Sequence, residues 1–169
     1  MRPSPESAAA PTTRLRVLIV TDEMEVGGSQ RQIVNLALGL DPAQHEVTVA
    51  YFRNGSFFVD TLRQGGVRVV ELPKRGRIDA RFLAALVREL RTGRYDVVHA
   101  FAFSAEFWTA LSCAALPPAR RPQLVTSIRG TYDWYGAWHW RAKRWVSRRS
   151  SRVVANSRMG ADFAAQRMG

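Results

Sequence analysis

Apolar positions along the chain alternate between short continuous runs and longer stretches with helical spacing. The runs are rich in Val, Ile and Leu and predict buried parallel strands over 15–21, 46–52, 67–72, 95–101, 124–128 and 152–155. Helical spacing follows each run and predicts helices ending near 40, over 57–64, 82–93, 105–115 and 138–149, and from about 158 onward. Six such alternations with right-handed crossovers predict an α/β fold, a doubly wound, Rossmann-like parallel sheet with helices on both faces. The domain is expected over 14–169, preceded by a flexible tail over 1–13 that is rich in Pro, Ser and Ala.

Ligands of such a sheet bind beyond the carboxyl ends of the strands, which places any site in a few short segments. The first of these contains Gly27 and Gly28, followed by Ser29. The turn lacks both the GxGxxG fingerprint and a Walker A ending. Paired glycines at a helix start still expose backbone N–H groups to an anion. A tight turn without a ligand, in which Ser29 caps the helix with Gln32 in the reciprocal position, explains the same residues equally well.

Six segments, taken in order and with their spacing, resemble glycosyltransferase family 4. They are RVLIVTDEMEVGGSQRQIVNLALGL at 16–40, HEVTVAYF at 45–52, GGVRVVELP at 65–73, YDVVHAFAFSAEFWTAL at 95–111, LVTSIRGTYD at 124–133 and RVVANS at 152–157. The resemblance is to the N-terminal, acceptor-side Rossmann domain of the two-domain GT-B fold. It covers nearly the whole chain from Leu15.

The resemblance implies a function. The expected protein is the acceptor-side domain of a retaining, nucleotide-sugar-dependent enzyme that transfers a hexosyl group to a sugar or lipid-linked acceptor in cell-envelope polysaccharide or glycolipid synthesis. It implies no metal and no cofactor, with the nucleotide sugar as co-substrate held mainly by a C-terminal donor domain. That domain is absent from these residues and would belong to the same or another chain, so the isolated chain is expected to be inactive. The alternative is a non-enzymatic α/β binding or regulatory domain.

The resemblance also implies substrate-binding positions, although it assigns no catalytic residue. They are Gly27, Gly28, Ser29, Gln30, Arg31, His99, Arg129, Gly130, Asp133, Asn156 and Ser157. Arg129 stands where the family often has a His, and a permanently charged Arg clamps an anion but is no general base. A surface salt bridge is the other reading of Arg129, and a packed, hydrogen-bonded ring is the other reading of His99. Asn156 or Ser157 could equally cap the last helix.

Charge and composition add possible partners. The chain carries 25 Lys and Arg against 14 Asp and Glu, and residues 86–169 hold 14 of the basic side chains but five acidic ones. This excess predicts an anionic partner, although GC-rich coding explains an Arg-rich composition as well. The acidic loop around Asp22 could hold sugar hydroxyls or simply be solvated. The single Cys113 excludes an intramolecular disulfide and favours the cytoplasm, and three scattered His make no metal site.

The segment over 132–152 combines four tryptophans with six cations and predicts contact with an anionic membrane surface. The candidates for that contact are Trp138, Arg141, Arg144, Trp145 and Arg148. A basic helix with Trp on its apolar face suits the inner membrane face, where the protein would be peripheral. A covering helix that buries its Trp side chains on the sheet is the alternative. Nucleic acid is a weaker prediction because no recognised binding signature accompanies the basic surface.

Overall fold

The computed structural model describes residues 13–130 and 132–168. The tail predicted over 1–13 therefore lies outside the described residues except for its last position. The strands are Leu15–Thr21 (β1), His45–Tyr51 (β2), Arg68–Glu71 (β3), Val97–Ala100 (β4), Gln123–Ile128 (β5) and Arg152–Ala155 (β6). The helices are Gly28–Gly39 (α1), Phe57–Gln64 (α2), Ala80–Gly93 (α3), Phe103–Ala114 (α4), Ala137–Ser147 (α5) and Arg158–Met168 (α6), with a 3₁₀ turn at Pro118–Arg120 (η1).

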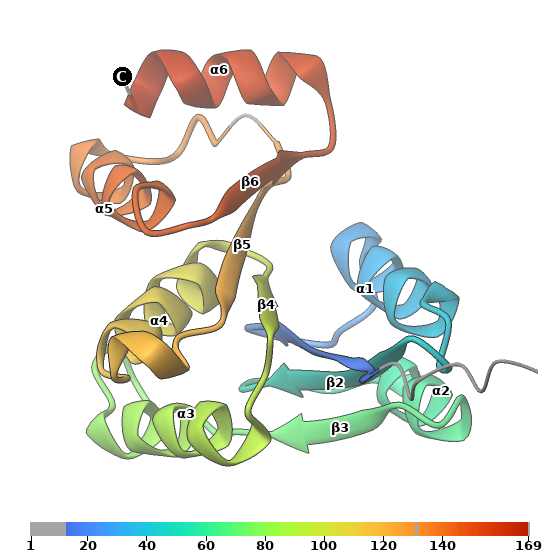
Figure 1. Cartoon of the computed structure of the whole chain (residues 1–169). Helices are drawn as coiled ribbons and strands as arrows, with labels where there is room; N and C mark the ends of the chain where they lie inside the picture. Colours follow the sequence, from blue (N-terminus) through green and yellow to red (C-terminus); the bar gives the residue numbers. More distant parts are fainter. Residues whose placement is uncertain (1–12, 131, 169) are drawn as a thin grey trace, which may run out of the picture.

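All six strands form one parallel sheet in the order β3-β2-β1-β4-β5-β6 (Figure 1). In its centre Val17 of β1 pairs with Val47 of β2 on one side and with Val97 of β4 on the other. The predicted doubly wound, Rossmann-like fold is confirmed. The first strand lies in the middle, and the chain winds outward from it in both directions, as in other sheets of this class.

Two apolar clusters cover the two faces of the sheet. Helices α3, α4 and α5 cover one face, where Leu18 of β1 packs in a cluster with Phe82 and Trp108. Helices α1 and α2 cover the other face, where Ile19 packs with Ile33 and Leu62. Neighbouring residues of β1 thus point to opposite faces and are both fully buried, which explains why the strand is an uninterrupted apolar run. A third, small cluster joins α6 to α5 at the β6 end of the sheet.

Helix boundaries follow capping groups more than apolar spacing. Helix α3 begins at Ala80, two residues before the first apolar residue of the predicted pattern. The reason is Asp79, whose carboxylate accepts the backbone N–H groups of Arg81 and Phe82 at 3.0 Å each. Helix α4 also begins two residues before its predicted start, at Phe103, although no side-chain hydrogen bond from its N-cap residue Ala102 caps it. In the described part of the chain no helix is long and apolar enough to span a membrane.

Candidate functional site

The candidate site lies at the carboxyl edge of the sheet, where β1 and β4 are neighbours. From β1 the chain moves outward to β2 and β3, and it then returns to β4 on the other side of β1 (Figure 1). The connections after β1 and β4 therefore lead to helices on opposite faces of the sheet, and the edge of the sheet between these two connections is called the crevice. Open α/β sheets bind their ligands in this crevice.

The turn between β1 and α1 presents bare backbone to the crevice. Gly27 is extended, with φ −163° and ψ 169°, and Gly28 is the first residue of the helix. A Cβ atom at Gly28 would meet no atom within 4 Å, so the space in front of the first helical turn is open. The predicted cap by Ser29 with Gln32 is wrong. The helix begins before Ser29, and α1 has no side-chain cap. Its first N–H groups therefore remain available to an anion.

Arg129, at the end of β5, connects the two sides of the crevice. Its Nη1 donates a hydrogen bond to Oε1 of Gln32 on α1. The guanidinium lies over the ring of Phe101, with 4.3 Å between Cζ and the ring centroid. The backbone N–H of Arg129 donates to the hydroxyl of Tyr132 at 2.8 Å. The alternative of a surface salt bridge is wrong, because the described carboxylates make no ion pair with this residue.

The guanidinium of Arg129 is charged, partly buried and incompletely satisfied. Its Nε atom is buried without a hydrogen-bond partner among the described residues. Burial lowers the pKa of the guanidinium, and the neighbouring Tyr132 and Glu106 only partly oppose this. The buried Nε is closed to a ligand, but Nη2 is not buried and has no hydrogen-bond partner among the described residues, so it could donate to an anion. This geometry makes Arg129 suited to hold a phosphate.

His99, on β4, is packed and hydrogen-bonded beneath Arg129. Its Nε2 is 2.8 Å from Oγ of Ser127 on β5, and its ring lies 4.2 Å from that of Phe101. Burial first, and the charge of Arg129 second, lower the pKa of His99 to about 4. The imidazole is therefore neutral near pH 7. Of the two predicted readings of His99, the packed ring agrees with these contacts.

A buried ion pair that the sequence did not suggest holds Ser127, the hydrogen-bond partner of His99. Lys143 of α5 donates to Oε2 of Glu106 on α4, and the two side chains are 2% and 0% exposed. Glu106 also accepts the backbone N–H of Ser127 at 2.9 Å, while Lys143 donates to the Ser127 carbonyl at 2.9 Å. Burial raises the pKa of Glu106, and the ammonium of Lys143 opposes that rise. Together the pair fixes the strand residue that holds His99.

The loop after β4 carries backbone strain beside the crevice. Ala102 has φ 68° and ψ 150°, a conformation that is almost confined to glycine. This backbone conformation turns the chain sharply from β4 into α4. As a result, Phe101 lies under Arg129, and Phe103, two residues later, is already the first residue of α4.

The acidic loop after β1 is fixed to the loop after β2. The backbone N–H of Met24 donates to the carbonyl of Asn54 at 2.8 Å, and Ser56 Oγ donates to the Met24 carbonyl at 2.6 Å. Burial raises the pKa of Asp22, although Arg53 nearby lowers it. Hydrogen bonds from the backbone of Asp22 and Glu23 also lower this pKa. A partly desolvated carboxylate of this kind is unlike a freely solvated turn, so Asp22 remains a candidate for binding hydroxyl groups.

The remaining predicted positions fall into two groups. Asn156 belongs to the crevice because its Nδ2 donates to the Arg129 carbonyl at 3.4 Å. Ser157 caps α6 by accepting the N–H of Gly160 at 3.0 Å, as the alternative reading predicted. Gly130 lies in the Arg129 loop, and a Cβ there would also meet open space. Gln30 on α1 lies against the glycine turn, because a Cβ atom at Gly27 would be 2.5 Å from its Oε1. Arg31 on α1 and Asp133 after β5 are exposed.

The structure divides the Trp and Arg segment between surface and interior. Trp138 is 57% exposed, and Arg141, Arg144 and Arg148 are exposed along α5. Trp145 is instead half-buried against the core, with Phe107 at 5.9 Å and the Arg149 guanidinium 4.1 Å above its ring. Lys143, one of the six cations of the segment, is buried and not on the surface, because it forms an ion pair with Glu106.

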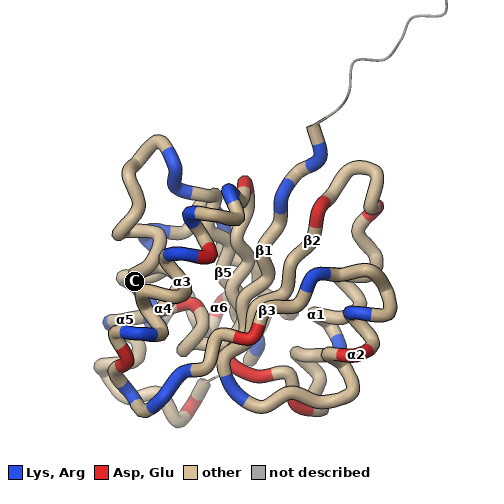
Figure 2. Tube along the Cα trace, turned by 90° about the horizontal axis from the view of Figure 1, so that it is seen from below, with Lys and Arg blue, Asp and Glu red and all other residues tan. Residues whose placement is uncertain are grey.

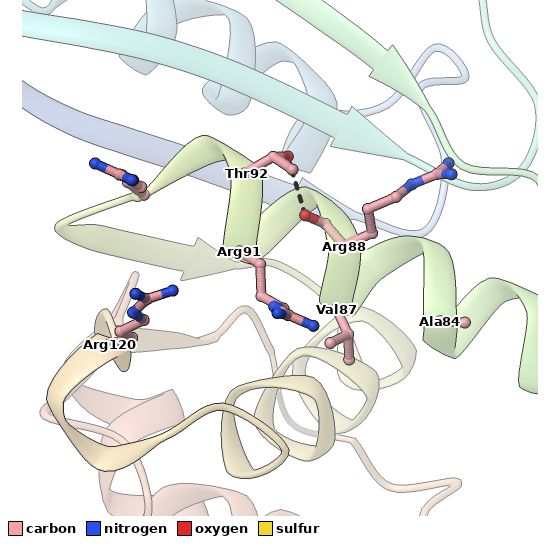
Figure 3. Close-up of a pocket in the computed structure, with 7 residues that line it drawn as sticks. Ala84, Val87, Arg88, Arg91, Thr92 and Arg120 are labelled. Carbon is pink, nitrogen blue, oxygen red and sulfur yellow. Dashed lines mark hydrogen bonds between the residues drawn. The ribbon is translucent and has the colours of Figure 1, made fainter.

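A further part of the cationic excess gathers away from the crevice, near the amino edge of the sheet. Arg88 and Arg91 of α3, with Arg94 and Arg120, line a hollow of about 650 Å³. Figure 3 shows Arg91 and Arg120 directed toward the same hollow, while Arg88 extends away from it. In Figure 2 the side that carries α3, α4 and α5 shows more Lys and Arg than Asp and Glu.

The fold and the crevice together define a Rossmann-like domain with Arg129 and the start of α1 at the carboxyl edge of its sheet. The chain matches the sequence profile of Glycosyltransferase Family 4 over residues 26–169 and belongs to that family. Among curated proteins, none matches the chain. HepE (Alr3699) of Anabaena, solved with UDP and with UDP and glucose, shares the fold at 19% identity and a TM-score of 0.75. Each alignment covers 92% of this chain and 41% or 42% of HepE, so the chain spans about two fifths of the length of that protein.

Proposed function

We propose that the chain is the acceptor-side domain of a retaining glycosyltransferase, which transfers a hexose from a nucleotide sugar to a hydroxyl group of a cell-envelope acceptor. Membership of glycosyltransferase family 4 supports the transferase activity. HepE, which has the same fold, was solved with UDP and glucose, and this supports a nucleotide sugar as donor. Retention of configuration, the hexosyl group and the cell-envelope acceptor rest on the family resemblance.

Two observations carry the proposal: the hydrogen bond between Arg129 and Gln32, which holds the guanidinium against α1, and the open backbone at Gly28, where the same helix begins. Gln32 and Phe101 hold the guanidinium in place, and its Nη2 still lacks a partner among the described residues. The free N–H groups at Gly28 and Ser29 carry the positive end of the helix dipole. Two preorganised donors of this kind suit a diphosphate, the leaving group of a nucleotide sugar.

These groups would act by stabilising charge during transfer. The bond between the anomeric carbon and the diphosphate oxygen breaks, and a bond to the acceptor oxygen forms. The acceptor proton leaves with the diphosphate, whose added negative charge Arg129 and the α1 amides would stabilise. The neutral His99 would support Arg129 by packing, and the partly buried Asp22 would accept a hydrogen bond from a sugar hydroxyl.

We propose that a second α/β domain, in the same or another chain, provides most of the contacts with the nucleotide sugar. The chain alone is then expected to release no nucleoside diphosphate from a panel of nucleotide sugars. It should still bind UDP weakly, with a Kd of about 1 mM, or about 4 kcal/mol of binding free energy. Turnover that depends on the 169-residue chain alone would contradict the two-domain proposal.

Amide and side-chain NMR shifts of the ¹⁵N-labelled chain during a UDP titration test the site. The expected shifts lie at Gly27, Gly28 and Ser29 and at the Arg129 Nε–H group. Arg129→Gln should weaken UDP binding about tenfold, because it removes a charged hydrogen bond. Arg141→Gln, an exposed arginine on α5, is the matched control and should bind UDP normally. Binding that leaves these signals unmoved, or that survives Arg129→Gln, would exclude the crevice as the diphosphate site.

A membrane-surface binding domain without transfer activity is the second candidate function. The observation that favours it is the exposed row of Arg141, Arg144 and Arg148 beside the exposed Trp138. Such a surface could also hold the transferase near a lipid-linked acceptor at the inner face of a membrane, so the two candidates are compatible.

A further inference from the structure

We propose that a groove beside the crevice binds the non-reacting part of the acceptor, and that this part is a lipid phosphate or diphosphate. The inference rests on the proposed transferase function and names the class of its acceptor. The groove has a volume of about 770 Å³ and lies between the loops that follow β2 and β3 and the first turns of α4 and α5. Its lining combines three cations with an apolar wall.

The cations come from two different loops and face the same space. Arg53 follows β2, while Lys74 and Arg77 follow β3. No carboxylate is present among the described residues that line the groove. The nearest acidic group on the β3 side, Asp79, is already bonded to the N–H groups of Arg75, Arg81 and Phe82. The positive charge of the groove is therefore not neutralised from within its lining.

Lys74 is held in position and not simply solvated. Its Nζ donates to the carbonyl oxygens of Gly76 and Arg77, the latter at 3.2 Å, and lies 5.3 Å from the ring centroid of Trp108. Burial and the nearby charge of Arg53 lower the pKa of Lys74. Two like charges kept close in a partly desolvated place repel each other, and a phosphate between them would remove that cost.

Apolar side chains from the loop after β3 and from α4 and α5 complete the lining and are partly open to solvent. Ile78 is 89% exposed and Trp138 is 57% exposed, which leaves two large apolar side chains without cover in the groove. Phe103 contacts Trp138 at 5.8 Å and Phe107 at 6.3 Å, so the aromatic residues form a continuous surface. Exposed apolar surface rimmed by polar groups marks a binding site.

The groove is continuous with the crevice through a stack of aromatic rings. Tyr135 lies parallel to His139 of the groove at 4.9 Å and contacts Phe103 at 5.5 Å. Tyr135 also stacks on Tyr132 with 4.5 Å between the ring centroids, and the Tyr132 hydroxyl accepts the backbone N–H of Arg129 at 2.8 Å, so the stack reaches the crevice. An acceptor whose phosphate and chain occupy the groove could thus present its sugar to the crevice.

Charge and shape together favour an amphiphile over the other occupants. A free sugar needs several neutral hydrogen-bonding groups, and besides its cations and two tryptophans the lining holds two polar side chains, Ser104 and His139. A plain phosphate would leave Ile78 and Trp138 uncovered. A phosphorylated isoprenoid matches both parts, because its phosphate faces the cations while its chain covers the apolar wall.

Binding of farnesyl diphosphate to the full chain, followed by tryptophan fluorescence below the micelle-forming concentration, tests the inference. We expect it to bind at least about tenfold more tightly than either farnesol or inorganic pyrophosphate, a difference of about 1.4 kcal/mol. Arg77→Gln and Lys74→Gln should weaken the charged contact, and Trp138→Ala the apolar one. Arg141→Gln and Trp134→Ala are matched controls outside the lining and should bind normally.

Three results would overturn the inference. Equal affinity for pyrophosphate indicates a plain anion site, and equal affinity for farnesol indicates an unspecific apolar surface. Equal loss in the control variants indicates general adsorption, such as contact with a bilayer. Arg129→Gln separates the two proposals, because it should weaken UDP binding about tenfold and leave farnesyl diphosphate binding unchanged. Failure of UDP binding alone thus counts against the transferase, and failure of farnesyl diphosphate binding alone counts against the lipid acceptor.

Discussion

Arg129 and Gln32 are joined by a side-chain hydrogen bond across the crevice, although they are 97 positions apart in the sequence. Gln32 lies on α1, the helix whose amino end faces the crevice, and Arg129 follows β5. A neutral amide at position 32 orients the guanidinium without neutralising it. The positive charge therefore remains available to a ligand, which a carboxylate at the same place would prevent.

This relationship predicts that Gln32→Glu weakens anion binding without harming the fold. A carboxylate would form an ion pair with Arg129 and compete with the diphosphate for the same charge. We expect UDP affinity to fall about tenfold, the scale of one charged hydrogen bond, while the free energy of unfolding stays equal or rises. Calorimetric titration with UDP and urea unfolding measure the two quantities. Equal UDP affinity in Gln32→Glu and the unchanged chain would remove Arg129 from the site.

The layers of the fold follow from local sequence signals. Each strand is an apolar run and each helix has its own spacing, so the elements, the two covered faces and even the cap at Ser157 follow from neighbours in the chain. The same local logic failed at Ser29, which looks like a cap but lies one residue inside α1. Glycine at the start of a helix gives no sharp boundary.

The interior of the site could not be predicted because its contacts are distant in sequence. Lys143 lies in a run of exposed cations, and nothing near it identifies Glu106, 37 positions earlier, as its partner. The sequence did contain a signal for a buried partner. Glu106 is the one charged residue of α4, and burying its carboxylate without a partner would cost folding free energy. The strained turn at Ala102 had no signal, since alanine is ordinary in sequence and unusual only at φ 68°.

Gly28→Val should block ligand binding and leave the fold intact. The φ angle of Gly28 is not positive, and a Cβ atom at this position would meet no atom within 4 Å. The added side chain therefore costs the folded chain little free energy. It would instead fill the space in front of the α1 amides, and UDP binding should fall about tenfold or more. Gly39→Ala on the same helix also meets open space and is the control. A folded Gly28→Val that binds UDP normally would exclude the turn.

Lys143→Met should destabilise the chain strongly. It leaves the carboxylate of Glu106 buried and unpaired, which costs about 3–5 kcal/mol of unfolding free energy. Combining Glu106→Gln with Lys143→Met should restore part of the loss, because no charge remains buried. Urea unfolding of the two single variants and the double variant forms a double-mutant cycle. Additive losses would show that the buried pair is not coupled, and Arg141→Gln on the same helix should change stability by less than about 0.5 kcal/mol.

The environment of His99 predicts a pH dependence of stability. Its pKa is lowered to about 4 in the folded chain, below the usual 6.5 of an exposed His. The unfolded state therefore binds more protons between pH 4 and 6.5, and the contribution of His99 to stability is complete above this window and falls as the pH falls through it. The loss should be of the order of 1–3 kcal/mol. The difference between the unchanged chain and His99→Gln in urea unfolding isolates it, and parallel pH profiles of the two would contradict the prediction.

Exposed arginines of α5 predict electrostatic binding to anionic vesicles, now with Lys143 excluded from the surface. Arg141, Arg144 and Arg148 are exposed and should each contribute about 1 kcal/mol of attraction to an anionic leaflet. The predicted insertion of Trp145 is less favourable than that of Trp138, because Trp145 already packs against the core while Trp138 is 57% exposed.

Co-sedimentation with anionic and neutral vesicles over a salt series tests this surface. Binding should be clear at low salt and weaken as screening shortens to about 8 Å at physiological salt. The triple change Arg141→Gln, Arg144→Gln and Arg148→Gln should remove most of it, whereas Trp138→Ala should reduce the part that resists salt. A triple change of the exposed Arg31, Arg81 and Arg158 to Gln lowers the net charge equally and is the control. If both triples lose binding alike, net charge alone attracts the vesicles and α5 has no special role, because only a localised surface depends on which arginines are removed.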